Sequence, residues 1–322
     1  MTRPRLLALR ALGLGDFLTG VPALRALRRA APEHELWLAA PPVLTPLVEL
    51  ADCVDAVVPT QELQPVPWHG PPPEIAVDLH GNGPPTKELL LRLGPARLVA
   101  FAGPHGCGGW HAGPAWRRDE HERRRWCRLV TEEFAVTADP DDVRIAAPAA
   151  TPPRRDAVVI HPGAASGSRR WPPERWVAVA RELTRTGHDV VLTGGPGEQP
   201  LVDAVRRAAG LVRDATAVDR SLGELAGLIA CARLVACGDT GIAHLATALG
   251  VPSVLLFGPT PPAWWGPPAG PHRVLWHGTA PGDPHAADPD PALLRISVPE
   301  VLTAISDQLA LGGDHAPQPL GQ

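Results

Sequence analysis

Residues 234–257, LVACGDTGIAHLATALGVPSVLLF, contain a strand, a helix and a second strand in immediate succession. The first four residues form an apolar run that predicts a buried strand, the middle predicts a helix, and the last four predict the next strand. Where the first strand gives way to the helix, the backbone N–H groups of Thr240 and Gly241 lack helical partners and lie at the positive end of the helix dipole. This junction predicts either a phosphate site or an ordinary helix capped by Asp239.

The same alternation of strand and helix extends in both directions along the chain. Further strands are expected at 6–9, 35–39, 56–58, 75–79, 98–101, 157–160 and 189–193, and further helices around 21–27 and at 43–50, 87–93, 174–186, 200–209 and 222–230. Such an order is typical of parallel sheets with helices on both faces. The proline-rich stretch 146–155 interrupts it. We therefore predict an α/β protein of two doubly wound, Rossmann-like domains, 1–150 and 151–322, facing each other across a cleft, with a flexible tail after Leu311.

Composition excludes several classes of function. The net charge of −4 provides no basic field for nucleic acid. No apolar run is long enough to span a membrane and no signal peptide is evident, so a cytoplasmic protein is expected. The five cysteines form no CxxC pair and the 13 histidines no HxxxH or HxH pair, so we expect reduced cysteines and no metal site.

The glycine turn after the first strand carries a carboxylate, Asp16, in the stretch Gly13–Thr19. A dinucleotide-binding fingerprint would need its third glycine where Leu18 stands, which argues against NAD or FAD. Asp16 is therefore either a helix N-cap or a general base, since a carboxylate in a partly closed cleft can have its pKa raised toward a useful range. Thr19 lies beside it, near the first helical turn.

Two loops of the second half offer further polar groups at strand ends. The stretch 161–172, HPGAASGSRRWP, places Arg169 and Arg170 after a tight turn, and arginine presents a fixed fork of donors to phosphate. A solvated arginine pair is the alternative. Gly194 and Glu198 follow the strand at 189–193, where Glu198 could hold a ribose or simply belong to a turn.

Taken together, these motifs resemble those of glycosyltransferase family 9, the ADP-heptose heptosyltransferases of lipopolysaccharide core assembly and their relatives. The residues that carry the resemblance span nearly the whole chain in matching order: Gly15-Asp16, Thr19, Val21-Pro22-Ala23-Leu24, His161-Pro162-Gly163, Arg169-Arg170-Trp171-Pro172, Asp239-Thr240-Gly241, His244-Leu245 and Phe257-Gly258-Pro259-Thr260. Each motif is weak alone, and the ordered set is specific.

The resemblance implies a GT-B fold and an inverting, metal-independent transfer from a nucleotide-diphosphate sugar, most simply ADP-heptose, with no other cofactor. The first domain would bind the acceptor and the second the donor. Asp16 would be the catalytic base; the donor diphosphate would contact Arg169, Arg170, Asp239, Thr240, Gly241 and His244; and the acceptor side would include Gly15, Thr19, Asp78, His80 and Asn82. The acceptor would be a glycan, a lipid-linked molecule or a small molecule.

The sequence departs from the family pattern at several positions. Arg169 stands where the family carries a phosphate-binding lysine, and Thr19-Gly20 stands where heptosyltransferases often carry a His-Thr pair. Basic residues for the acceptor are not obvious; the candidates are Lys87 and the arginine-rich stretch 117–128. That stretch could meet an anionic acceptor, but we expect a solvated helix face.

Two other functions fit the same motifs. One is a GT-B-type nucleotide-sugar epimerase or hydrolase, which would need a second acid or base and would turn the donor over without an acceptor. The other is a non-catalytic nucleotide-sugar-binding protein, which would not require Asp16. Peripheral contact with a membrane stays open, although no strongly basic amphipathic helix supports it.

Overall fold

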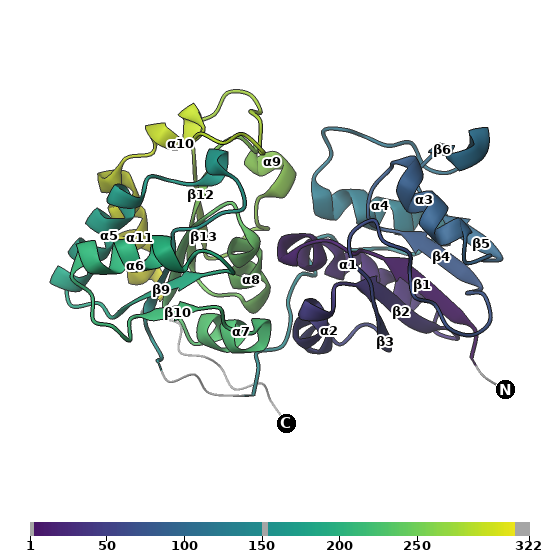
Figure 1. Ribbon diagram of the computed structural model, residues 1–322, viewed down its shortest axis with the longest axis horizontal. Helices are drawn as coiled ribbons and strands as arrows, with labels where there is room; N and C mark the ends of the chain where they lie inside the picture. Colours follow the sequence, from purple (N-terminus) through teal and green to yellow (C-terminus); the bar gives the residue numbers. More distant parts are fainter. Residues whose placement is uncertain (1–2, 150–153, 313–322) are drawn as a thin grey trace. The chain divides into compact units, whose positions relative to one another are not determined.

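The computed structural model describes residues 3–149 and 154–312, and the tail expected to be flexible lies outside them from residue 313 onward (Figure 1). The chain divides into two compact units, Met1–Ala146 and Ala147–Gln322. In Figure 1 the first unit is drawn in purple to blue and the second in teal to yellow. Each is an α/β unit built on a parallel sheet, as the alternation of elements predicts.

The elements of the first unit follow the chain as β1 (Arg5–Leu9), α1 (Leu14–Ala30), β2 (Glu35–Ala40), η1 (Pro42–Leu44), α2 (Thr45–Ala51), β3 (Ala56–Pro59), β4 (Ile75–Asp78), α3 (Pro84–Leu91), β5 (Arg97–Val99), β6 (Gly103–His105), η2 (Gly106–Gly108), β7 (Gly109–His111) and α4 (Glu122–Phe134). The sheet order is β3-β2-β1-β4-β5. Leu6 of β1 pairs with Leu36 on one side and Ile75 on the other, so β1 is central and buried on both faces.

The second unit contains β8 (Val158–His161), η3 (Gly167–Arg169), α5 (Pro173–Arg185), β9 (Val190–Gly194), α6 (Gln199–Ala209), β10 (Thr216–Val218), α7 (Leu222–Ala230), β11 (Leu234–Gly238), α8 (Gly241–Leu249), β12 (Ser253–Phe257), α9 (Pro262–Trp265), β13 (His272–Trp276), α10 (Pro291–Arg295) and α11 (Val298–Gly312). Its sheet order is β10-β9-β8-β11-β12-β13, all parallel. Trp171 and Trp176 pack edge to face in the core beside it.

Both sheets reverse their strand order next to the central strand. The reversal lies between β1 and β4 in the first unit and between β8 and β11 in the second. Loops that leave the carboxyl ends of such neighbouring strands diverge and leave room for a ligand. The segments that follow these four strands are therefore the places to look for a site, one in each unit.

Some elements were not expected from the sequence. The strand β13 begins with His272 and Arg273, and its half-exposed edge position does not require the apolar run that marks a central strand. The β6–β7 hairpin is short and glycine-rich, so it has no strand pattern. Cys53, Cys127, Cys231 and Cys237 are free thiols.

Candidate functional site

Asp16 lies in the first turn of α1, directly after the central strand of the first unit. Gly13 is the N-cap, so Asp16 occupies the third helical position rather than the cap itself, and its carboxylate accepts hydrogen bonds from the backbone N–H groups of Gly13 and Asp16. Burial raises the pKa of Asp16 above its usual range; the charge of Arg10 opposes this and the charge of Glu122 adds to it. A raised pKa makes a carboxylate a stronger base than one in water.

A buried arginine supports this turn, and the sequence motifs did not single it out. Arg10 follows β1 directly and is fully buried. Its guanidinium donates to the backbone oxygens of Asp16 and Leu79. It also donates to Thr19 Oγ1 and to Glu122 Oε1, and these two distances are both 3.1 Å. Thr19 in turn donates to the Asp16 carbonyl at 2.9 Å, so its hydroxyl is occupied inside this cluster. A basic residue at the end of an apolar strand is the only signal that could have suggested it.

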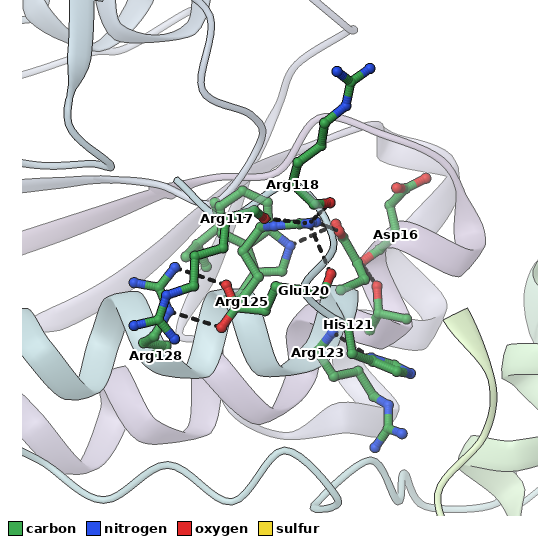
Figure 2. Close-up of polar contacts among 12 residues, drawn as sticks. Asp16, Arg117, Arg118, Glu120, His121, Arg123, Arg125 and Arg128 are labelled. Carbon is green, nitrogen blue, oxygen red and sulfur yellow. Dashed lines mark hydrogen bonds and ion pairs between the residues drawn. The ribbon is translucent and has the colours of Figure 1, made fainter. Parts of the chain in front are cut away.

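The arginine-rich stretch is not the solvated helix face that we expected. Arg123 and Arg125 are each only 7% exposed. Arg125 binds Glu122 and also donates to the backbone oxygens of Arg117, Arg118 and Glu120, so it holds the preceding loop in place (Figure 2). The expectation is wrong for these side chains because their partners lie outside the helix face. Arg125 binds the buried Glu122 and loop carbonyls, and Arg123 binds the Pro140 carbonyl and the Asp141 carboxylate.

The other arginines of the same stretch are exposed or partly buried. Arg117, Arg118 and Arg124 are exposed, and in Figure 2 the Arg118 side chain points away from the cluster around Asp16. Arg128 donates to both carboxylate oxygens of Glu120, at 2.8 Å each, in the bidentate geometry that arginine favours.

The neighbouring strand β4 ends in a tightly hydrogen-bonded turn. Asp78 is fully buried and accepts from Thr86 Oγ1 at 2.6 Å and from the backbone of His80 at 3.0 Å. Asn82 accepts from Lys87 Nζ through its carbonyl and its side chain, at 3.0 and 2.9 Å. Asp78 thus shapes the turn.

His80 stands at the tip of that turn as a neutral imidazole. Burial, followed by the charge of Arg10, lowers the pKa of His80 to about 4. Its Nδ1 atom is buried without a hydrogen-bond partner among the described residues. A neutral imidazole with an unpaired ring nitrogen can form a hydrogen bond with a hydroxyl group of a bound molecule.

In the second unit, α8 begins with an open N-terminus at the carboxyl end of β11. Thr240 is the N-cap residue, its side chain makes no capping hydrogen bond, and the first turn contains no acidic residue. The Asp239 carboxyl lies just before it, 5% exposed. Burial raises the pKa of Asp239 to about 6, against the opposing effects of Arg169 and a hydrogen bond with Thr260. Unpaired N–H groups at such a terminus bind anions.

Of the two predicted arginines, one reaches this terminus. Arg169, at the end of η3, donates to the Asp239 carbonyl at 3.3 Å and to Ser166 Oγ at 3.2 Å. Arg170 is exposed and instead donates to the Ala164 carbonyl at 2.8 Å. Gly238 permits the close approach, since a Cβ there would lie 3.1 Å from the Arg169 carbonyl oxygen. His244, one turn into α8, packs against Trp265 with ring centroids 5.8 Å apart.

Glu198 and Gly194 meet at the end of β9, beside the turn that follows β8. The Glu198 carboxylate accepts from the Gly195 N–H at 2.8 Å and lies 3.6 Å from His161 Nε2. A Cβ at position 163 would lie 2.1 Å from a Glu198 carboxylate oxygen, so a larger residue there would displace the Glu198 side chain. Glu198 therefore lies against the turn that follows β8, and its role toward a ribose stays a prediction.

Residues 3–149 and 154–312 show neither a metal-binding cluster nor a membrane-spanning helix. No cluster of three or more His, Cys, Asp or Glu side chains in that part of the chain is arranged to hold a metal ion. Within the same ranges, no helix combines the length and the apolar character needed to cross a membrane.

Comparison with known proteins gives a consistent family assignment. The family model described as glycosyltransferase family 9 (heptosyltransferase) matches residues 130–290, half of the chain. Lipopolysaccharide heptosyltransferase 1 of Pseudomonas aeruginosa is 38% identical over 99 residues, covering 31% of this chain and 28% of that protein. The chain spans about a third of the length of the curated relatives it matches.

Solved structures extend the likeness in fold to both units. The ADP-heptose lipopolysaccharide heptosyltransferase II of E. coli superimposes with a TM-score of 0.78 at 18% identity, covering 96% of this chain and 99% of that one. A family 9 glycosyl transferase from Veillonella parvula gives 0.76 at 20% identity, with 97% and 98% covered. At these identities the likeness establishes the fold, which is the predicted GT-B arrangement of α/β units.

Proposed function

Because this chain belongs to glycosyltransferase family 9, we propose that it moves a sugar, a heptose, from an ADP-linked donor to a hydroxyl group of an acceptor. The transfer inverts the anomeric centre and needs no metal ion. The choice of ADP-heptose draws on the E. coli protein of the same fold, whose name specifies that donor. Under this proposal the second unit, within 151–322, binds the donor, and the first, within 1–150, binds the acceptor.

One observation carries the donor side: Arg169 lies against the residue that precedes the open N-terminus of α8. A guanidinium and a free helix end provide fixed positive potential for a departing diphosphate. Fixed donors of this kind supply a large part of catalysis when charge develops in the transition state. The contacts are assigned to Arg169, Arg170, Asp239, Thr240, Gly241 and His244, with Glu198 and Gly194 toward the ribose and base.

The proposed reaction uses a base in the first unit and an anion site in the second. Asp16 takes the proton from the acceptor hydroxyl while that oxygen forms a bond to the anomeric carbon. The bond from that carbon to the diphosphate oxygen breaks, and its electron pair leaves on the diphosphate. Attack from the face opposite to the leaving group inverts the configuration. The raised pKa of Asp16 supports its role as the base.

The acceptor side is assigned to the residues around Asp16. Gly15 lies in the first turn of α1 and Thr19 in the second, and Asp78, His80 and Asn82 belong to the turn at the end of β4. His80, neutral and with an unused ring nitrogen, is the best placed of these to bind a hydroxyl. The acceptor is a glycan, a lipid-linked molecule or a small molecule that presents a hydroxyl group.

A donor screen tests the proposal. Purified protein is combined with ADP-, UDP-, GDP- and dTDP-sugars in EDTA, and binding is followed by calorimetry. We expect selective binding of the ADP-sugar, and release of ADP in EDTA only when an acceptor extract is present. Release of ADP without acceptor would identify a hydrolase, and conversion of the donor into another nucleotide sugar would identify an epimerase. Failure to bind any nucleotide sugar would contradict the proposal.

A further inference from the structure

The buried pair Arg10–Glu122 joins four parts of the first unit beside Asp16. Arg10 follows β1, and its donors reach the first turn of α1, the Leu79 carbonyl after β4 and Glu122 at the start of α4. It also lies over the Trp126 ring, 5.0 Å from the ring centroid. A buried guanidinium is strongly destabilising unless its donors are paired. So many specific partners indicate a fixed position.

Glu122 is the counter-charge of this group. Its carboxylate accepts from Arg10, from Arg125 and from Trp126 Nε1 at 2.7 Å. Burial alone would raise the pKa of Glu122, but Arg10, Arg125 and the Trp126 hydrogen bond outweigh it, so the pKa lies below its usual value. Glu122 therefore stays ionised at neutral pH. It is an anion close enough to influence Asp16.

Gly20 makes the space that Arg10 occupies. A Cβ at position 20 would lie 2.7 Å from both Cδ and Nε of Arg10, closer than real Cβ contacts. Gly20 is buried within α1, where alanine would otherwise favour the helix. The glycine that replaces the second residue of the family's His-Thr pair is thus matched to the arginine at position 10.

We propose that Arg10 and Glu122 are positioning residues for Asp16, with Arg10 fixing the first turn of α1 and the pair setting the charge around the carboxylate. The kinetic consequences rest on the proposed function, whereas the effect on the carboxylate itself does not. Removing Glu122 takes away a negative charge and favours ionised Asp16. Removing Arg10 takes away a positive charge and disfavours it.

Other charged or titratable groups belong to the segments that surround Arg10 and Glu122. They are Asp78 and His80 after β4, Glu120 and His121 before α4, and Arg123 and Arg125 on α4. Burial also raises the pKa of Asp78, so a pH profile alone could confuse the two carboxyls. A signal that belongs to Asp16 alone is therefore required.

The test is a carbon NMR titration of protein labelled at the aspartate carboxyls, with the Asp16 signal assigned by its loss in Asp16→Asn. We expect Glu122→Gln to lower the pKa of Asp16 and Arg10→Gln to raise it, each by at least about half a pH unit. The matched controls are Glu132→Gln and Arg124→Gln, exposed positions on the same helix, and neither should shift it. No shift, or two shifts in one direction, would overturn the proposal.

Activity gives the second readout. The acidic limb of kcat/KM should move with the measured pKa, down in Glu122→Gln and up in Arg10→Gln. If wild-type protein transfers no sugar, the proposed function fails while the NMR result still decides this inference.

Gly20→Ala covers the case in which Arg10→Gln does not fold, because it keeps every charge. Displacement of Arg10 should lower kcat at least about tenfold, leave donor KM unchanged and destabilise the protein, opposite to the usual effect of alanine in a helix. A stabilised, fully active Gly20→Ala would contradict the proposal.

Discussion

The two units share one topology but treat the helix at the strand-order reversal in opposite ways. In the first unit, the N-terminus of α1 is filled by the protein's own anion, since Asp16 bonds back to the N–H of Gly13. In the second, the first turn of α8 has no acidic residue and no side-chain cap. A helix end that carries its own carboxylate has little need of another anion, and one that lacks it can bind one from outside.

The charges around each helix end follow the same division. Next to α1, Arg10 is neutralised by Glu122 within the fold. Next to α8, Arg169 lies at the surface edge of η3 and contacts a backbone carbonyl of the loop. The comparison teaches that one sheet topology can present a base or an anion site, depending on whether the first turn of the helix contains an acid.

The largest expected effect on the rate of transfer is that of replacing Asp16. Asp16→Asn keeps the shape of the side chain but cannot accept a proton, so we expect transfer to fall by about 10²–10⁴-fold. Donor affinity should be unchanged, because the donor contacts are assigned to the other unit. Steady-state rates and donor calorimetry measure both. Near-normal turnover would rule out Asp16 as the base.

The next largest effect on the rate is that of replacing Arg169 in the second unit. Arg169→Met should lower kcat by about 10²–10³-fold and weaken ADP binding, as expected for loss of one fixed donor to a developing charge. Arg169→Lys, which restores the residue type of the family, should recover part of the rate. Arg170→Met should lose less, because the Arg170 side chain is directed to Ala164. Equal losses at both positions would contradict the geometry.

The buried carboxylate of Asp239, just before α8, should lower the stability of the folded protein at neutral pH. The folded-state pKa of Asp239 is about 6, above the unfolded value of about 3.9. The folded state therefore binds the proton more tightly, and its stability falls as pH rises from about 4 to about 6. Asp239→Asn removes this penalty, so unfolding at pH 7 should require on the order of 2–3 kcal/mol more.

The gain should vanish below pH 4, where Asp239 is protonated in both states. Denaturant unfolding at pH 4 and pH 7 gives the comparison, with Asp307→Asn, exposed on α11, as the control. A gain of equal size at both pH values would show that the charge of Asp239 is not its cause.

The smallest effect comes from giving α8 the acid that α1 contains. Ala243 holds in α8 the third helical position that Asp16 holds in α1. Ala243→Asp should therefore weaken ADP binding about tenfold, near the upper end of charge effects at helix ends. Ala243→Asn has the same size without the charge, so only the difference between the two variants counts. Equal ADP affinities of the two variants would contradict the inference that an acid in the first turn of α8 keeps an outside anion from binding.

Much of the fold could be predicted from the sequence. Parallel strands buried on both faces appear as short apolar runs such as 6–9 and 234–237, so the alternation and the doubly wound class were confirmed. Half-exposed edge strands lack such runs, and β13 was missed for that reason. The residues that follow central strands, Asp16 and Asp239, could also be located, because topology places them at the reversal of strand order.

The support of Asp16 could not be predicted. Arg10 and Glu122 are 112 residues apart, and nothing local marks them as partners. An arginine-rich stretch is usually solvated, and only the packing of α4 on α1 shows that Arg123 and Arg125 are buried. Long-range pairing of charges depends on the assembled fold, whereas strand and turn patterns depend on neighbours in the chain.

The fit between Gly20 and Arg10 also constrains the order in which this lineage can change. While arginine occupies position 10, any larger residue at position 20 meets its side chain at 2.7 Å. A shorter side chain at position 10 must therefore arise first, through an intermediate that leaves Glu122 without one of its two cations. Across descendants of this protein, a residue larger than glycine at position 20 should therefore occur only where position 10 no longer carries arginine.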